Sequence, residues 1–147
     1  MAAHGVVVVA GWDPSGGGGL IRDLLTLRDL RARATGVVAA LTTQDASGRG
    51  GVDPVSSDLM LRQLDAAAPR RGRFVLKIGM VYSRANIEAL AGWIERRHPI
   101  AVVLDPVLEA KGGLKLATRD ALLAYPQLVR HATVLTPNLV EARNLQA

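Results

Sequence analysis

A chain of 147 residues, of which 49% are hydrophobic and 21% are charged, is long enough to form one packed domain and too apolar to be intrinsically disordered. The absence of cysteine excludes disulfide scaffolds, cysteine-based zinc sites and thiol nucleophiles. The formal net charge of +5 comes mainly from 15 arginines, which are dispersed along the chain without interleaved aromatics, so we expect solvated helix faces and no nucleic-acid partner.

Strands and helices alternate regularly along the sequence. We expect a β-branched strand at 6–10, a glycine-rich loop at 11–19, a helix at 20–30, a strand at 36–41, a polar loop at 42–53 and a helix at 56–67. A strand at 74–78, a helix at 83–97, a strand at 100–104, a loop at 105–113, a helix at 117–123, a strand at 133–135 and a helix from Asn138 onward follow. In the 56–67 helix, Leu59, Leu61 and Leu64 are expected to face the core.

This alternation builds βαβ units. Residues 1–147 are therefore expected to form a single α/β domain with a mostly parallel, doubly wound sheet and helices on both faces. No apolar run approaches the roughly 20 residues of a membrane-spanning helix, and the first residues lack the features of a secretory signal. We therefore expect a cytoplasmic protein with no membrane partner.

Polar clusters follow the predicted strands. They comprise the 11–19 loop, Thr42 to Asp45, Gly79-Met80, Asp105-Pro106-Val107 and Thr136-Pro137-Asn138. In an open parallel sheet, ligands bind at the carboxyl ends of the strands, near the point where the strand order reverses. Functional residues are therefore expected in these loops.

The 11–19 loop opens a helix, and helix amino termini favour anions, so it can serve as a phosphate cradle. It contains neither a P-loop nor a dinucleotide-binding fingerprint, and a tight turn that needs permissive glycine torsions accounts for the same pattern. Gln44 can accept from an amine and donate to a neighbouring ring nitrogen, which suits an aminopyrimidine edge, although a loop glutamine can equally bind backbone. Asp23 lies early in a helix, where the helix dipole favours a carboxylate in any case.

The later loops allow two interpretations each. Asp105 ends a strand and either points into the crevice or starts a turn. Lys111 either places an ammonium group near phosphates or lies in a simple loop. Asn138 and Glu141 have the spacing of a capping box, and the same pair can hold magnesium through water; the two roles do not exclude each other.

Together these motifs resemble the hydroxymethylpyrimidine and phosphomethylpyrimidine kinases of thiamine biosynthesis, within the ribokinase superfamily. The matching stretches run in family order: Ala-Gly-Trp-Asp-Pro-Ser-Gly-Gly-Gly-Gly at 10–19, Ala-Leu-Thr-Thr-Gln at 40–44, Lys-Ile-Gly-Met at 77–80, Val-Leu-Asp-Pro-Val at 103–107 and Thr-Pro-Asn-Leu-Val-Glu-Ala at 136–142. The resemblance implies transfer of the γ-phosphate of ATP to the hydroxymethyl group of an aminopyrimidine, and then to its monophosphate.

The resemblance also implies roles for individual residues. Gln44 is expected to bind the pyrimidine edge. The same pocket is expected to be formed by Gly11, Asp23, Met80 and Val107, with Thr42 at its rim. Asp105, Lys111 and Asn138 are expected near the phosphates, and Asn138 and Glu141 are expected to hold Mg²⁺ through water.

The sequence departs from the family at several positions, among them Trp12, Leu25, Arg28, Ala34 and Asp45, and in its length. Trp12 stands where a small polar residue is usual, which leaves the substrate preference open. Family members also continue well beyond position 147, and their further residues carry most of the nucleotide site and the catalytic group. We therefore expect the chain to be the N-terminal part of such a kinase, without a catalytic residue and with little activity alone. A degenerate aminopyrimidine-binding module and a pyridoxal-type kinase fragment are the alternatives. A homodimer, or pairing with another chain through an exposed sheet edge, is also expected.

Overall fold

The computed structural model describes residues 5–45, 47, 49–70 and 73–146. The strands are β1 (Gly5–Trp12), β2 (Ala34–Thr42), β3 (Val52–Pro54), β4 (Phe74–Ile78), β5 (Ala101–Leu104) and β6 (Val134–Leu135). The helices are α1 (Gly19–Asp29), α2 (Ser57–Ala67), α3 (Arg84–Arg97), α4 (Arg119–Ala124), α5 (Pro126–Val129) and α6 (Leu139–Gln146).

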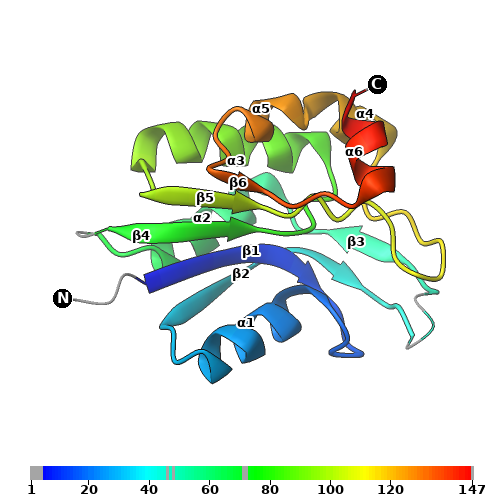
Figure 1. Cartoon of the computed structure of the whole chain (residues 1–147), viewed down its shortest axis with the longest axis horizontal. Helices are drawn as coiled ribbons and strands as arrows, with labels where there is room; N and C mark the ends of the chain where they lie inside the picture. The colour runs from blue at the N-terminus through cyan, green and yellow to red at the C-terminus, as the bar shows by residue number, and fades with distance from the viewer. Residues whose placement is uncertain (1–4, 46, 48, 71–72, 147) are drawn as a thin grey trace.

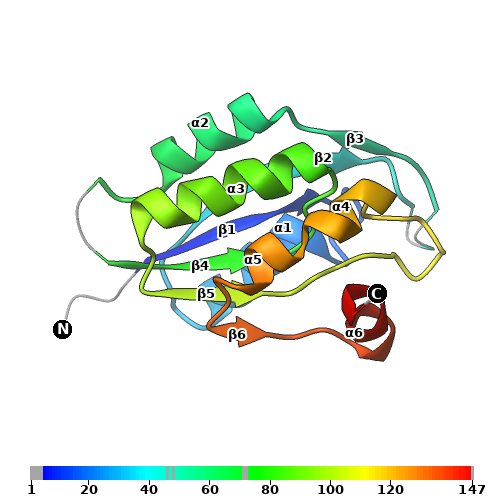
Figure 2. The same cartoon turned by 90° about the horizontal axis from the view of Figure 1, so that it is seen from above.

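The strands form one sheet in the order β3-β2-β1-β4-β5-β6 (Figure 1). Every neighbouring pair is parallel except β2 and β3, which are antiparallel. Helix α1 covers one face, and α2, α3, α4 and α5 lie on the other (Figures 1 and 2). The predicted class, a mostly parallel doubly wound sheet with helices on both faces, is confirmed.

Successive side chains of the central strands point to opposite faces of the sheet, because a strand is pleated, and they therefore pack into a core on each face. On the face of α2 and α3, Val7 and Val9 pack with Leu76 and Ile78 in the main core. On the opposite face, Val8 packs against α1 in a smaller core that also contains Ala10 and Leu20. The middle of β1 is therefore buried on both sides, as its continuous run of valines indicates.

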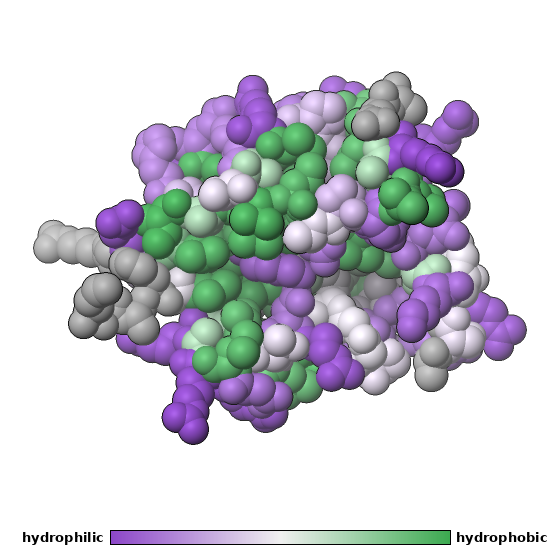
Figure 3. Space-filling model, viewed as in Figure 1, coloured by the Kyte–Doolittle hydropathy of each residue, from purple (hydrophilic) through white to green (hydrophobic). Residues whose placement is uncertain are grey.

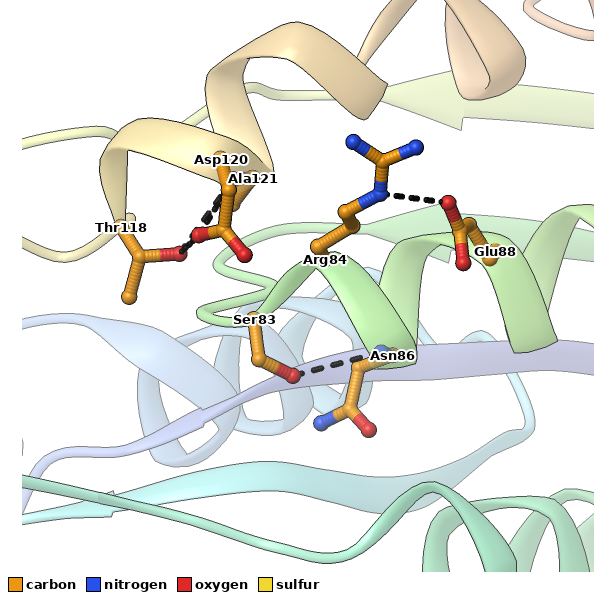
Figure 4. A network of polar contacts seen from close by, with 7 residues as sticks. All are labelled: Ser83, Arg84, Asn86, Glu88, Thr118, Asp120 and Ala121. Carbon is orange, nitrogen blue, oxygen red and sulfur yellow. Dashed lines mark hydrogen bonds and ion pairs between the residues drawn. The ribbon is translucent and has the colours of Figure 1, made fainter.

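Side-chain caps fix the beginnings of three helices. Ser56 accepts from the backbone N–H of Leu59 at the start of α2, and Ser83 accepts from that of Asn86 at the start of α3. Thr118 caps α4 in the same way, through the N–H of Ala121 (Figure 4). Each cap satisfies a backbone donor that the helix itself cannot pair. Asn86 also ties α3 to the sheet, because its side-chain amide donates to the carbonyl groups of Ala39 and Val55.

Four details differ from the sequence prediction. The segment 42–53 was expected to be a loop, but its end forms the short strand β3, and α5 was not expected. The helix expected at 117–123 begins two residues later, after its cap Thr118. Leu59 is 44% exposed rather than buried, and Met60 takes the core position beside Leu64.

Strand β6 lies at one edge of the sheet, where apolar side chains are exposed to solvent. Val134 and Leu135 are exposed, and so are Leu139 and Val140 at the start of α6. Figure 3 shows apolar surface between hydrophilic residues on the face of the molecule that carries β6 and α6. Pairing through this edge stays a prediction. No helix in the described part of the chain is long and apolar enough to cross a membrane.

Candidate active site

The strand order reverses between β1 and β4, because the chain moves outward from β1 to β2 and then crosses to the other side of β1. A cavity of about 290 Å³ lies at the carboxyl ends of these strands, the place where such sheets bind ligands. Its wall is formed by the ends of β1, β2, β4 and β5 and by the first turns of α1. The lining residues are Ala10, Gly11, Trp12, Asp13, Gly18, Gly19, Arg22, Asp23, Thr42, Gln44, Lys77, Gly79, Met80, Asp105, Val107 and Leu116.

All six residues predicted to bind the substrate meet in this cavity, although they come from five separate segments of the chain. They are Gly11, Asp23, Thr42, Gln44, Met80 and Val107. Asp105 lines the same cavity. Lys111 lines an adjoining cavity of about 320 Å³, which shares Gln44 and Val107 with the first. Asn138 and Glu141 line neither cavity.

The glycine-rich loop folds around the carboxylate of Asp13. The Oδ1 atom accepts from the backbone N–H of Ser15 at 2.9 Å and from its hydroxyl at 2.8 Å, and Oδ2 accepts from the N–H of Gly18 at 3.0 Å. Gly19 has φ +59°, and a Cβ there would lie 2.4 Å from the carbonyl oxygen of Gly11. The turn therefore requires glycine at position 19, which confirms the structural interpretation of this loop without excluding an anion beside it.

Burial raises the pKa of the Asp13 carboxyl, but hydrogen bonds from Ser15, Gln44 and Gly18 together outweigh burial and hold the pKa below its ordinary value of 3.8. The carboxylate is therefore ionised at neutral pH and can only accept hydrogen bonds.

Gln44 lies at the mouth of β2, where a short hairpin-like loop holds its backbone. The N–H of Thr43 donates to the carbonyl of Gly51, and a Cβ at Gly50 would lie 2.7 Å from the Cα of Gln44. Nearby, the hydroxyl of Thr42 donates to the carbonyl of Trp12 at 3.0 Å and joins the ends of β2 and β1. The side-chain carbonyl oxygen of Gln44, Oε1, is enclosed and has no hydrogen-bond partner among the described residues.

A lysine that sequence analysis did not single out lies at the floor of the cavity. The ammonium nitrogen of Lys77, on β4, is 2.5 Å from Oδ2 of Asp23 and 3.8 Å from Oδ2 of Asp105. The side chains of Lys77 and Asp23 are only 20% and 23% exposed. The cation therefore joins two predicted site residues that are far apart in the sequence. A charged residue inside the apolar strand 74–78 is the signal that could have identified it.

Asn138 and Glu141 form a capping box at the start of α6. Oδ1 of Asn138 accepts from the N–H groups of Val140 and Glu141, and Oε2 of Glu141 accepts from the N–H of Asn138, all at 2.9 Å. The capping interpretation is therefore confirmed. Glu141 is nevertheless buried, and its carboxylate has no ion-pair partner in the described part of the chain. A buried carboxylate with one oxygen left for further bonding fits a hydrated cation nearby.

The capping box lies at the same edge of the sheet as the cavity. The hydroxyl of Thr136, at the end of β6, donates to Oδ1 of Asp105 at 3.2 Å. Between these loops, burial raises the pKa of the Tyr125 phenol, and the negative charges of Glu141 and Asp105 raise it further. No group of three or more His, Cys, Asp or Glu side chains that could hold a metal ion directly occurs among the described residues.

Solved structures with the same fold define the class. A phosphomethylpyrimidine kinase from Clostridium difficile superposes with a TM-score of 0.84 at 29% identity, covering 97% of this chain and 62% of that one. Bacillus subtilis pyridoxal kinase, solved with ADP, has a TM-score of 0.84 at 29% identity over 98% of this chain and 54% of its own. The fold is that of the ribokinase-like kinases.

Sequence comparison identifies the family within this class. The family model described as phosphomethylpyrimidine kinase matches residues 13–147, so the chain belongs to that family. A hydroxymethylpyrimidine/phosphomethylpyrimidine kinase from Rhizobium meliloti is 38% identical over 91% of this chain and 50% of its own length. The Salmonella typhimurium enzyme of the same name is 36% identical over 99% of this chain and 55% of its own. The chain thus spans about half the length of these relatives, and the predicted resemblance is confirmed.

Proposed function

We propose that the cavity serves the reaction for which the relatives are named, phosphorylation of hydroxymethylpyrimidine and then of its monophosphate with ATP as the donor, and that residues 1–147 contribute the ring-binding part of the site. In the first step the hydroxymethyl oxygen attacks the γ-phosphorus of ATP, a phosphorus–oxygen bond forms, the bond to ADP breaks, and the hydroxyl proton leaves. Two relatives from different bacteria carry the name of this activity, and a related pyridoxal kinase was solved in complex with an ATP analogue.

The observation that carries the proposal is that the six residues expected to bind the ring, Gln44 among them, meet in one small cavity at the carboxyl ends of the strands. About 290 Å³ lies at the lower end of the range for small-molecule sites, which suits a single substituted ring. Met80 and Val107 offer apolar contact to the faces of a ring, while Gln44 offers an acceptor and a donor to its edge. A ring with an exocyclic amine beside a ring nitrogen matches this pattern.

Two of the three groups predicted to lie near the phosphates line this cavity or the adjoining one. Asp105 lines it, and Lys111 lines the adjoining one, where an ammonium group would balance phosphate charge. In this proposal Glu141 and Asn138 would hold Mg²⁺ through water, and Mg²⁺ would supply positive charge beside the phosphates of ATP. In this proposal Lys77 and Asp23, which line the cavity, orient the polar substituent of the ring.

The test is calorimetric titration of the 147-residue chain with 4-amino-5-hydroxymethylpyrimidine. We expect binding, and Gln44→Ala to weaken it about tenfold, because the substitution removes the paired acceptor and donor. Gln127→Ala, on α5 and outside the cavity, is the matched control and is expected to bind like the wild type. Absence of binding by the wild type would overturn the proposal.

A pyridoxal-type activity is the second candidate, because pyridoxal kinases superpose as closely as phosphomethylpyrimidine kinases do. The same titration with pyridoxal separates the two. Stronger binding of pyridoxal than of the aminopyrimidine would favour this alternative.

A further inference from the structure

One edge of the sheet gathers arginines that are far apart in the sequence. Apart from the short antiparallel strand β3, the strands run in one direction, so the segments that lead into them meet at the amino edge of the sheet, away from the cavity at the carboxyl ends. In Figure 1, strands β1, β4 and β5 begin on the side of the N-terminus and point away from it. Three segments at this edge carry exposed arginines: 30–33 before β2, 68–73 before β4 and 96–100 before β5. The described members of this set, the amino-edge arginines, are Arg31, Arg33, Arg70, Arg73 and Arg96.

Backbone pairing places two of these segments on either side of β1. The carbonyl of Arg33 accepts from the N–H of Val6 at 2.8 Å, at the start of β1. Arg73 directly precedes Phe74, which pairs with Gly5 on the opposite side of β1. The backbones of the two arginines therefore lie about two strand spacings apart, or roughly 10 Å along the edge.

The third segment is fixed against the second. The N–H of Ile100 donates to the carbonyl of Phe74 at 2.9 Å. The guanidinium group of Arg97 donates to the carbonyl of Pro69 at 2.9 Å, which brings the end of α3 beside the segment that carries Arg70. From β2 to β5 the edge spans three strand spacings, about 14 Å.

The positive charge of this edge is not neutralised within the described part of the chain. None of the amino-edge arginines forms an ion pair with another described residue. The carboxylates close to them each pair with an arginine outside the set: Asp29 with Arg28, Asp65 with Arg97 and Glu95 with Arg130. Basic side chains that cluster on one face of a domain are the electrostatic footprint of a polyanion-binding surface.

We infer that the amino edge binds the phosphodiester backbone of a double-stranded nucleic acid without reading its base sequence. A duplex carries one negative charge per about 1.7 Å, or about eight over the roughly 14 Å of this edge, which is enough to engage all the amino-edge arginines. Guanidinium groups match phosphate oxygens with paired hydrogen bonds. The expectation of no nucleic-acid partner came from the dispersal of the arginines along the chain, and the fold removes that dispersal.

A membrane surface fits the same edge less well. Segments that lie on a lipid surface bury aromatic or large apolar side chains beside their cations. The three segments contain no Phe, Trp or Tyr, and Leu30 is the exposed large apolar side chain in their described part. Single-stranded nucleic acid is disfavoured for a related reason, because its bases stack on aromatic side chains. The backbone of a duplex requires only the cations.

The test is fluorescence anisotropy of labelled duplexes of about 20 base pairs, one of DNA and one of RNA, titrated with the 147-residue chain. Five phosphate contacts predict a slope of about −4 in log affinity against log salt concentration, so binding is expected to weaken roughly 300-fold between about 50 and 200 mM salt. Binding of either duplex with this slope supports the inference, and the tighter of the two identifies the partner.

A variant with four of the amino-edge arginines replaced tests the location of the surface. It carries Arg31→Gln, Arg33→Gln, Arg70→Gln and Arg73→Gln. We expect it to bind at least about tenfold more weakly at about 50 mM salt, with a slope near −1, because only about one phosphate contact is left.

The matched control removes the same charge from exposed arginines outside the three segments. It carries Arg62→Gln, Arg84→Gln, Arg119→Gln and Arg143→Gln. It is expected to bind within about threefold of the wild type and to keep the wild-type slope, because its net charge changes equally but its amino edge does not. Circular dichroism checks that both variants fold.

A measurement on the wild type alone covers a variant that does not fold. In an NMR titration of the isotope-labelled chain with the duplex, the backbone amides of the three segments are expected to shift most. Shifts concentrated around the cavity, a control variant weakened as much as the amino-edge variant, or no binding of either duplex at about 50 mM salt would overturn the inference. Binding to vesicles of phosphatidylserine and phosphatidylcholine, with none to either duplex, would overturn it in favour of a membrane surface.

Discussion

Replacing Lys77 by methionine removes the cation at the floor of the cavity and keeps most of the aliphatic stem. The variant leaves Asp23 and Asp105 without the ammonium group that lies 2.5 Å and 3.8 Å from them. An exposed ion pair contributes at most about 1 kcal/mol to stability, whereas breaking a fully buried pair costs about 3 to 5 kcal/mol. Side-chain exposures of 20% and 23% place the Lys77–Asp23 pair between these limits, so we expect a loss of about 2 kcal/mol.

The assay is thermal unfolding followed by circular dichroism. For a domain of this size, about 2 kcal/mol corresponds to a fall of about 6 °C in melting temperature. Lys115→Met is the matched control. Lys115 also pairs with a carboxylate, that of Glu109, but its side chain is 73% exposed, and we expect its loss to change stability by less than about 0.5 kcal/mol. Equal melting temperatures for Lys77→Met and the wild type would refute the argument that this pair is structurally important.

Three further predictions concern the loops of the site. Gly19→Ala is expected to destabilise the fold by more than about 2 kcal/mol in urea unfolding, because φ at Gly19 is +59° and the new Cβ would meet the carbonyl of Gly11. Gly92→Ala, within α3, is the control and is expected to stabilise the fold. A mild effect at position 19 would contradict the tight turn between β1 and α1. Asn138→Ala is expected to cost about 1 kcal/mol through loss of the α6 cap, and an unchanged urea midpoint would contradict the capping box. The depressed pKa of Asp13 stabilises the fold above the unfolded-state pKa of about 3.8, and this contribution is lost as the pH falls through the lower folded-state pKa. The difference in unfolding free energy between wild type and Asp13→Asn is therefore expected to be constant from about pH 5 to 8 and to shrink below about pH 4. A difference that changes between about pH 5 and 8 would contradict this prediction.

The order and type of the main elements could be predicted because each has a strong local pattern. Strand 74–78 has the bounds that were predicted, and α2 and α3 begin one residue after the predicted starts, directly behind their caps Ser56 and Ser83. Strand β3 was missed because three residues, ending in Pro54 at the edge of the sheet, show no period that separates a strand from a loop. Leu59 was placed in the core because residue type alone does not determine which leucine of a helix faces inward.

The site was partly predictable for a related reason. Polar residues directly after the strands converge because parallel strands end at one edge of a sheet, and this brought Gln44, Met80 and Val107 into one cavity. Pairings across the chain were not visible in the sequence. Lys77 meets Asp23 from 54 positions away, and the meeting of Asp13 and Gln44 in one cavity depends on how two loops fold against each other.

A crystal structure of the chain with bound 4-amino-5-hydroxymethylpyrimidine tests the central claim most directly. The account predicts the ring in the cavity between the ends of β1 and β4, with its amine about 2.7 to 3.2 Å from Oε1 of Gln44. A ring bound elsewhere on the molecule, or one in the cavity with its amine turned away from Gln44, would contradict it.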